Sequence, residues 1–238
     1  MHIYPDALAV VRDLRPDEPV ILNRPHAARR AARFFVEKFP GKSLYAVKAN
    51  PSPALIALLW DNGITHFDVA SLSEVRLVRD NAPEAVLCFM HPVKAEEAIR
   101  EAYFDHGVRT FSLDTSEELD KIVRATDGAT DLTLCVRIRV SSDHSKLSLA
   151  SKFGADPADV KQLLIDTRPG RRFGLAGGLG INNVADAICR VAPALVPTID
   201  GAEPVNWVAL AKASLAGMVA MSSTAKPVAP FLPSMAIW

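Results

Sequence analysis

Cysteine is scarce in this sequence, and a long apolar run is missing. The three cysteines of the 238 residues, Cys88, Cys135 and Cys189, are widely spaced and form no CxxC pair. This pattern argues against a disulfide-stabilised scaffold or a metal site, so we predict free core thiols in a reducing compartment. No run could span a bilayer, and the N-terminus carries acidic residues where an export signal needs an apolar core. We therefore expect a cytoplasmic location.

The sequence also lacks net charge, because 27 Lys and Arg residues balance 27 Asp and Glu residues. This balance gives no reason to expect nucleic acid or a membrane as a partner. A composition of 49% hydrophobic and 23% charged residues is typical of globular proteins. A GxGxxG motif is absent after the first predicted strand, which argues against a dinucleotide-binding sheet.

Strand-like and helix-like segments alternate along residues 1–174. We predict strands at residues 19–22, 43–48, 65–70, 85–89, 110–113 and 132–140, and helices at residues 24–38, 53–60, 71–79, 94–106, 116–125 and 156–167. Apolar strands separated by helices are typical of an α/β protein with parallel strands, and about six such units favour a (β/α) barrel. Functional side chains of such barrels lie at the carboxyl ends of strands. Five polar residues come at or just after predicted strand ends: Lys48, Asp68, His91, Asp114 and Arg139.

Residues 175–238 have a different character, since they are rich in alanine and proline and poor in charge. We expect two apolar helices, at residues 185–194 and 207–221. Three prolines between Pro227 and Pro233 predict an irregular tail. The chain therefore divides into residues 1–174 and residues 175–238.

Several sequence blocks follow one another in an order and spacing that resemble a known family. The blocks are YAVKANPSPALIALL, GITHFDVASLSEV, HPVKAEEAIREA, GVRTFSLDTSEELDKI, LCVRIRV and SKFGAD. They resemble the fold-type III decarboxylases of basic amino acids, which use pyridoxal phosphate (PLP), and most closely the ornithine decarboxylases. The resemblance covers roughly residues 19–167. It implies an alanine-racemase-like (β/α)8 TIM barrel, here incomplete, with PLP as the cofactor.

The activity that the resemblance implies is decarboxylation of a basic amino acid, with L-ornithine converted to putrescine for polyamine biosynthesis. The FDVAS block favours this reading over diaminopimelate decarboxylases, which show a glycine-rich variant there. Lysine and diaminopimelate decarboxylation stay open as alternatives. YAVKANPSP also differs from the pattern that is typical of alanine racemases.

The resemblance implies that Lys48 forms a Schiff base with PLP, and that Ala46, Asp68 and Glu74 lie beside the cofactor. An amine must be neutral to attack an aldehyde, and apolar surroundings favour that state. Each polar residue also has a plainer interpretation. Lys48 would extend to water from a strand end, Asp68 would begin a helix, and Glu74 would complete a capping box with Ser71.

Arg137 and Arg139 alternate with apolar neighbours on one predicted strand. Both are therefore expected to point to the same face, which would be the barrel interior. There they would bind the cofactor phosphate or form a charged network. These two interpretations stay open.

The resemblance ends near residue 174. The family continues with a histidine-bearing strand of the form FHVGS, but the last histidine of this sequence is His144. The C-terminal β-domain is also missing, and the glycines at 177–180 come too early to be the family's phosphate loop. We hypothesise a frameshift or truncation, and do not expect the family's homodimer to form. A non-catalytic homologue and a gene remnant are the alternatives to an active enzyme.

Overall fold

The structure is a computed structural model, and it describes residues 3–39, 42–139, 153–177 and 210–212. Among these residues, none of the helices combines the length and the apolar character that crossing a membrane requires. The predicted helix at 185–194, the proline-rich tail, Cys189 and most of the glycine-rich stretch lie outside the described residues.

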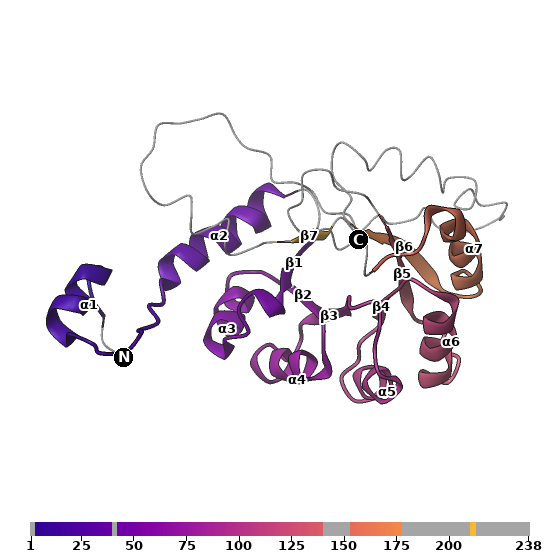
Figure 1. The fold of residues 1–238 in the computed structure, drawn as a ribbon, viewed down its shortest axis with the longest axis horizontal. Helices are drawn as coiled ribbons and strands as arrows, with labels where there is room; N and C mark the ends of the chain where they lie inside the picture. Colours follow the sequence, from indigo (N-terminus) through magenta and orange to yellow (C-terminus); the bar gives the residue numbers. More distant parts are fainter. Residues whose placement is uncertain (1–2, 40–41, 140–152, 178–209, 213–238) are drawn as a thin grey trace.

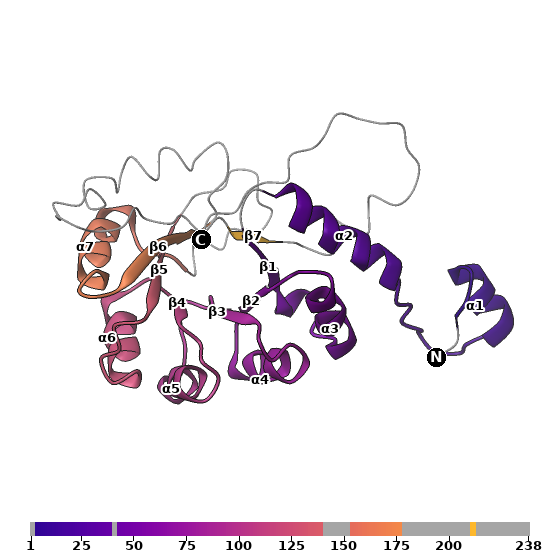
Figure 2. The same cartoon turned by 180° about the vertical axis from the view of Figure 1, so that it is seen from behind.

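One sheet of seven parallel strands organises the chain, in the order β6-β5-β4-β3-β2-β1-β7. Figure 1 shows these strands as an open arc, and Figure 2 shows the same arc from behind. The strands are β1 (Lys42–Ala46), β2 (His66–Val69), β3 (Val86–Phe89), β4 (Thr110–Leu113), β5 (Thr133–Ile138), β6 (Arg172–Gly177) and β7 (Leu210–Lys212). Because all strands run in parallel, their carboxyl ends lie along the same edge.

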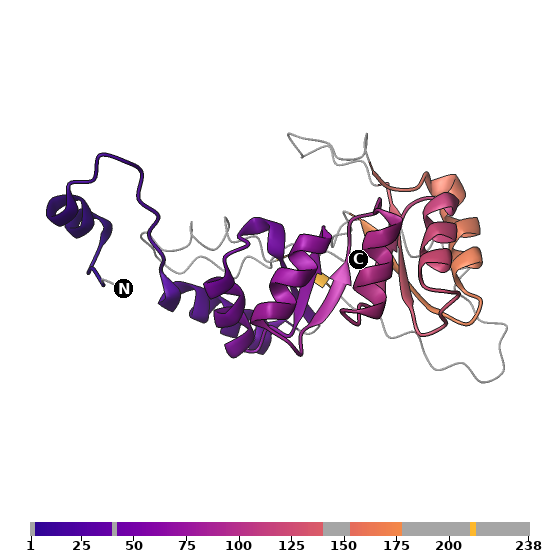
Figure 3. The same ribbon diagram turned by 90° about the horizontal axis from the view of Figure 1, so that it is seen from below.

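Helices connect the successive strands and cover the outer side of the arc (Figure 1). They are α3 (Pro53–Asp61), α4 (Leu72–Asn81), α5 (Glu96–Phe104), α6 (Ser116–Ala125) and α7 (Pro157–Thr167). The side chains of Ser71, Thr115 and Asp156 cap α4, α6 and α7 by accepting hydrogen bonds from backbone N–H groups of the first turn. Two helices precede the sheet, α1 (Ala7–Leu14) and α2 (Pro25–Lys38). Figure 3 shows α1 well apart from the strands.

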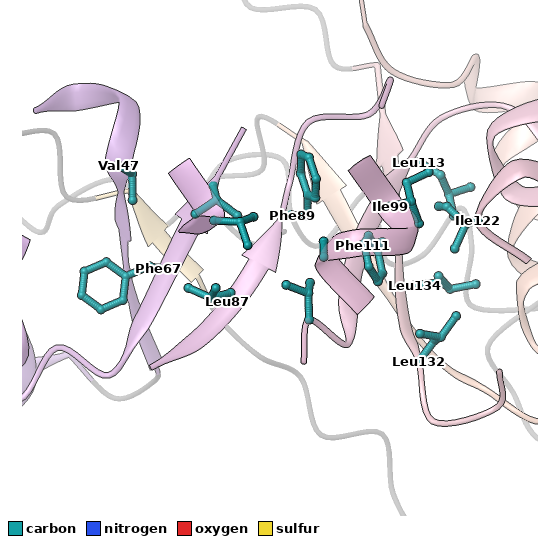
Figure 4. Close-up of a cluster of buried hydrophobic side chains, with 14 of the residues drawn as sticks. Val47, Phe67, Leu87, Phe89, Ile99, Phe111, Leu113, Ile122, Leu132 and Leu134 are labelled. Atoms are coloured by element: carbon teal, nitrogen blue, oxygen red, sulfur yellow. The ribbon is translucent and has the colours of Figure 1, made fainter. Parts of the chain in front are cut away.

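The main core lies between the sheet and the outer helices (Figure 4). Alternate strand residues such as Phe67, Phe111 and Leu134 point toward the helices, which contribute Ile99 and Ile122. A second, smaller cluster faces the other way and contains Leu44, Cys88, Met90, Cys135 and Ala176. Burial on both faces explains why these strands read as continuous apolar runs. We call the second face of the sheet the inner face.

The predicted α/β class with parallel strands is confirmed, but two local predictions are wrong and one helix was not predicted. Residues 19–22 form no strand, and Ile21 is 89% exposed. Strands β2 and β7 occupy both sides of β1, so residues 19–22 do not pair with β1. Helix α1 was not predicted. Residues Leu210–Lys212 pair with β1 as a strand, although we expected a helix over 207–221. An apolar run without a charge pattern does not distinguish a helix from a buried strand.

Truncating a leucine in the main core tests the placement of the sheet. Leu134→Ala is expected to lower the free energy of unfolding by about 2–5 kcal/mol, because Leu134 is completely buried between β4, β6 and the helices. The matched control Leu8→Ala lies on α1, where Leu8 is 71% exposed, and should change it by less than about 0.5 kcal/mol. Urea denaturation of both variants measures the difference, and equal effects would contradict this core.

Candidate functional site

The inner face of β1 and β2 places two of the predicted cofactor residues opposite each other. Ala46 pairs in register with Asp68, and Asp68 pairs with Cys88 on β3. Their neighbours Tyr45 and Phe67 point to the helices, so Ala46 and Asp68 face inward. Both are buried. The alternative interpretation of Asp68 as a helix-start residue is wrong, because Asp68 lies within β2 and Ser71 caps the helix.

Lys48 follows β1 instead of belonging to it. The strand ends at Ala46, and Val47–Ala49 form the 3-10 turn η1. The Tyr45 hydroxyl donates to the Asn50 carbonyl at 3.1 Å and so ties this turn to the strand. Burial raises the pKa of Tyr45 to about 12, so the hydroxyl keeps its proton as a donor. The Lys48 side chain is exposed at the carboxyl end of β1, whereas the sequence predicted a strand position in apolar surroundings.

Glu74 serves the turn between β2 and α4. Its backbone N–H donates to Ser71 Oγ at 3.3 Å, and its carboxylate oxygen Oε2 accepts from the Ala70 N–H at 2.8 Å. The capping role is therefore confirmed, with Ala70 as the donor in place of the expected Ser71. Glu74 thereby fixes the backbone two residues after Asp68, so it influences the site by holding this turn in place. Its predicted contact with a cofactor stays a prediction.

Arg137 connects the inner faces of three strands. Burial lowers the pKa of Arg137, and the nearby carboxylates of Asp114 and Asp68 partly offset this effect. The guanidinium carbon also lies 5.3 Å from the centre of the Phe153 ring. Phe153 also packs against the His91 ring in a T-shaped arrangement, with 5.4 Å between the ring centres. Arg137 thus gathers acidic and aromatic groups near the carboxyl ends of the strands.

Arg139 has different neighbours from Arg137, although the sequence predicted one shared face. Strand β5 ends at Ile138, so the alternation of side chains stops before Arg139. The Arg139 guanidinium lies 4.0 Å from the carboxylate of Asp156, the N-cap of α7. This side chain is 47% exposed, which fits a surface contact between a loop and a helix start.

A short segment at residues 153–155 lies against the end of β5. The Gly154 N–H donates to Asp114 Oδ2 at 2.8 Å, and the Ala155 N–H donates to the Arg137 carbonyl at 2.8 Å. Gly154 has a φ of +101°, and a Cβ atom there would lie 2.7 Å from the backbone nitrogen of Arg139. Only glycine therefore lets this segment approach the strand so closely.

Lys94 is a residue near the site that sequence reasoning missed. Its side chain is completely buried, and its ammonium group lies 3.0 Å from the carboxylate of Glu118. The HPVK block gave no sign of a buried lysine, because a lysine after a short loop is usually solvated. A signal was available in Glu118, which lies on the buried face of α6 together with Leu119 and Ile122. A carboxylate buried there requires a cation.

The two described thiols are buried, as predicted for core cysteines. Burial raises the pKa of Cys88, and the nearness of Cys135 adds to this effect. Burial also raises the pKa of Cys135 to about 12. Both thiols therefore stay protonated and unreactive, and they serve the inner face as apolar contacts. Among the described residues, no group of His, Cys, Asp and Glu side chains has the arrangement of a metal site.

The groups on the inner face fit PLP, which combines a phosphate, an aromatic ring and an aldehyde. Arg137 supplies a partly buried cation for an anion, and Lys48 supplies an amine. The hydroxyl of Ser112 on β4 is buried and makes no hydrogen bond within the described part of the chain. A buried hydroxyl without a hydrogen-bond partner is rare in protein cores and suits a site that binds a polar ligand.

A parallel β/α arc with these groups at its carboxyl ends is the architecture of a barrel-type PLP-binding domain. Residues 26–169 match the family described as "Pyridoxal-dependent decarboxylase, pyridoxal binding domain". The chain belongs to this family. The matched segment contains every candidate site residue: Ala46, Lys48, Asp68, Glu74, Arg137 and Arg139.

The proteins similar to this chain include decarboxylases and an antizyme inhibitor. A lysine/ornithine decarboxylase of Selenomonas ruminantium is 36% identical over 121 residues, which span 50% of this chain and 30% of that protein. Human antizyme inhibitor 2 is 32% identical over 124 residues, spanning 52% and 26% of the two chains. A mutant of SrLDC solved in complex with PLP superposes with a TM-score of 0.63 and 26% identity, covering 74% of this chain and 46% of that one. The chain thus spans under a third of these curated relatives and about half of the solved structure.

Adding a methyl group at Gly154 tests the contact between the 153–155 segment and β5. Gly154→Ala should lower the free energy of unfolding by more than the matched Gly128→Ala, because a Cβ at Gly128 has nothing within 4 Å. Both glycines have a positive φ, so Gly128→Ala measures the backbone cost alone, about 1–2 kcal/mol. Hydrogen exchange at the Ala155 N–H should also accelerate in Gly154→Ala. Equal destabilisation by the two substitutions would show that the close contact is not formed.

The buried lysine predicts a rise in stability at alkaline pH. Burial lowers the pKa of Lys94 from 10.5 to about 8, although Glu118 opposes the shift. Between these two values the unfolded chain binds the Lys94 proton and the folded chain does not, so the free energy of unfolding rises with pH through this group. Urea denaturation from pH 8 to 10.5 should show this rise in the wild type and a smaller one in Lys94→Met. Parallel curves for the two proteins would contradict the buried position of Lys94.

Proposed function

We propose that this chain binds PLP on the inner face of the sheet and attaches it covalently through Lys48. The observation that carries the proposal is that Asp68 and Asp114 lie near Arg137, at the same carboxyl edge of the sheet at which Lys48 follows β1. This gathering occurs within the segment that matches a pyridoxal-binding domain. The reaction we infer is decarboxylation of a basic amino acid. Because the chain spans only part of its relatives, this activity is a proposal for the whole protein.

Each residue has a role that follows from its surroundings. Arg137 is a permanent cation whose planar donors suit a phosphate group. Asp68 presents a buried carboxylate to the same space, which suits a proton-bearing nitrogen or hydroxyl of a ligand. Glu74 holds the Ala70 N–H and thereby fixes the backbone that carries Asp68. Phe153 and His91 provide an aromatic border at the carboxyl ends.

The inner face also surrounds Asp68 with apolar side chains. Leu44, Met90 and Ala176 are buried beside the polar residues, together with the two protonated thiols. A dry environment strengthens the electrostatic contacts of Arg137 and Asp68 with a bound ligand. When bound, PLP supplies the electron sink that stabilises the carbanion left by the loss of carbon dioxide.

L-ornithine is the substrate we favour, with putrescine as the product and polyamine biosynthesis as the pathway. The FDVAS block supports this choice, and the relatives include a lysine/ornithine decarboxylase. Lysine and diaminopimelate are the alternative substrates. A cytoplasmic location belongs to the same proposal. For the family's homodimer we keep the sequence-based expectation that this chain does not form it.

A non-catalytic homologue is the second candidate function. It is favoured by the similarity to human antizyme inhibitor 2, whose name does not denote a decarboxylase. The lack of any histidine after His144 in the sequence also favours it, because the family pattern expects one there. The exposed position of Lys48 does not discriminate between the two functions. A lysine that reacts with a cofactor and a lysine that is only solvated are both accessible from outside.

Reductive trapping of PLP tests the proposal. The wild type mixed with PLP should show a visible absorbance band, and borohydride should fix the cofactor on the peptide that contains Lys48. Lys48→Met should lose both signals, whereas Lys42→Met, at the other end of β1, should keep them. Carbon dioxide release from ornithine, lysine and diaminopimelate then identifies the substrate. A band without any release favours the non-catalytic homologue, and label spread over many lysines would overturn the cofactor proposal.

A further inference from the structure

Lys94 is a fully buried cation with no part in the cofactor contacts proposed above. It lies in the loop between β3 and α5, and its side chain is 0% exposed. The ammonium group donates to the Ser112 carbonyl at 2.5 Å and to the His91 carbonyl at 2.9 Å, and it lies 3.0 Å from Glu118 Oε1. These three acceptors match the three N–H donors of a lysine. The position is therefore built for a charged lysine.

Glu118 and Lys121 complete the network around Lys94. Glu118 Oε1 also accepts from the Lys94 backbone N–H at 3.2 Å, and its second oxygen accepts from the Lys121 ammonium at 2.6 Å. Lys121 in turn donates to the Lys94 carbonyl at 2.9 Å. The first turns of α6 thus grip both the backbone and the side chain of Lys94. The other charged or titratable groups near the ammonium are Asp114, at the end of β4, and His91.

The backbone that Lys94 holds leads directly to the candidate site. Ser112 is the next-to-last residue of β4, and Asp114 follows the strand. The Asp114 carboxylate accepts from Gly154 and lies near Arg137, while His91 borders Phe153. Lys94 therefore connects the carboxyl ends of β3 and β4 through its hydrogen bonds to the His91 and Ser112 carbonyls. A shift of either end would move a group that touches Arg137 or Phe153.

Stability alone gives a poor reason for this lysine. Burying an ion pair costs desolvation that its attraction rarely exceeds, and well-packed apolar residues of similar size often stabilise a protein as much or more. The burial of Lys94 disfavours its charged form even with Glu118 beside it. An apolar residue cannot form directional hydrogen bonds, whereas the ammonium group holds the Ser112 and His91 carbonyls at defined positions.

We propose that Lys94 is a positioning residue that holds the ends of β3 and β4, so that Asp114 keeps its contact with Gly154 and its place beside Arg137. Resting on the proposed function, the same contact sets the affinity of the site for PLP. Lys94 itself touches neither the cofactor nor the substrate. Its effect passes through the Ser112 and His91 carbonyls to Asp114 and Phe153.

The test uses three variants of the full chain and two measurements. Lys94→Met removes the three donors, and Lys94→Met/Glu118→Leu replaces the ion pair with apolar groups. Lys121→Met is the matched control, because it removes a lysine of the same network whose side chain is 25% exposed. Hydrogen exchange at the Gly154 N–H, followed by NMR without cofactor, reports the Asp114 contact. Titration with PLP, followed by absorbance, reports the affinity.

Lys94→Met should accelerate exchange at Gly154 by about 10-fold and raise the Kd for PLP by about 10-fold, because the ends of both strands lose their anchor. The double variant should regain the unfolding midpoint of the wild type but keep the fast exchange and the weak affinity. Lys121→Met should change both quantities by less than about 2-fold.

A double variant that restores exchange and affinity together with stability would overturn the proposal, because Lys94 would then act only in the fold. Unchanged exchange at Gly154 in Lys94→Met would overturn it as well, while PLP binding by the wild type would leave the proposed function standing. If the wild type binds no PLP but Gly154 responds to Lys94→Met, the proposed function fails and the positioning role is supported.

Discussion

Hydrogen bonding between neighbouring parallel strands fixes the place of the candidate site residues Ala46, Asp68 and Arg137. The register puts Ala46 beside Asp68 and pairs Leu113, the last residue of β4, with Val136 on β5. Because side chains alternate along each strand, a slip of one residue would turn Asp68 into the apolar core and Phe67 toward the site. The large side chains packed under the outer helices prevent that slip. The main core thus defines the inner face, although it contributes no group to it.

Charge on and near the inner face is kept in place by partners from elsewhere in the sequence. Arg137 on β5 has two carboxylates nearby, Asp68 on β2 and Asp114 just after β4, and Lys94 forms an ion pair with Glu118 on α6. A buried charge is costly unless paired, so the Lys94–Glu118 pair constrains two elements at once.

The alternation of helices and strands was predictable because each apolar run has a clear period and clear ends. Ser71 and Asp156 marked helix starts, and both act as caps in the structure. The strand predicted at residues 19–22 failed for a physical reason, because a strand exists only where a neighbour offers free backbone groups. Lys48 was predicted at the end of the strand but lies in the 3-10 turn that follows it. The hydrogen bond from the Tyr45 hydroxyl to the Asn50 carbonyl ties this turn to the strand. Neither partner is visible in the local pattern.

The alternation of strands and helices between residues 42 and 167, its parallel arrangement and the residues that could carry chemistry at the carboxyl ends of strands followed from the sequence, whereas α1 and β7 did not. Periodicity and caps are local properties, so local reasoning finds them. The tertiary structure sets Arg137 near Asp68 and Asp114, while Arg139 lies beside Asp156. It also decided that Lys94 is buried against Glu118. These outcomes depend on distances between residues far apart in the chain, and such distances are set by the packing of the sheet against its helices.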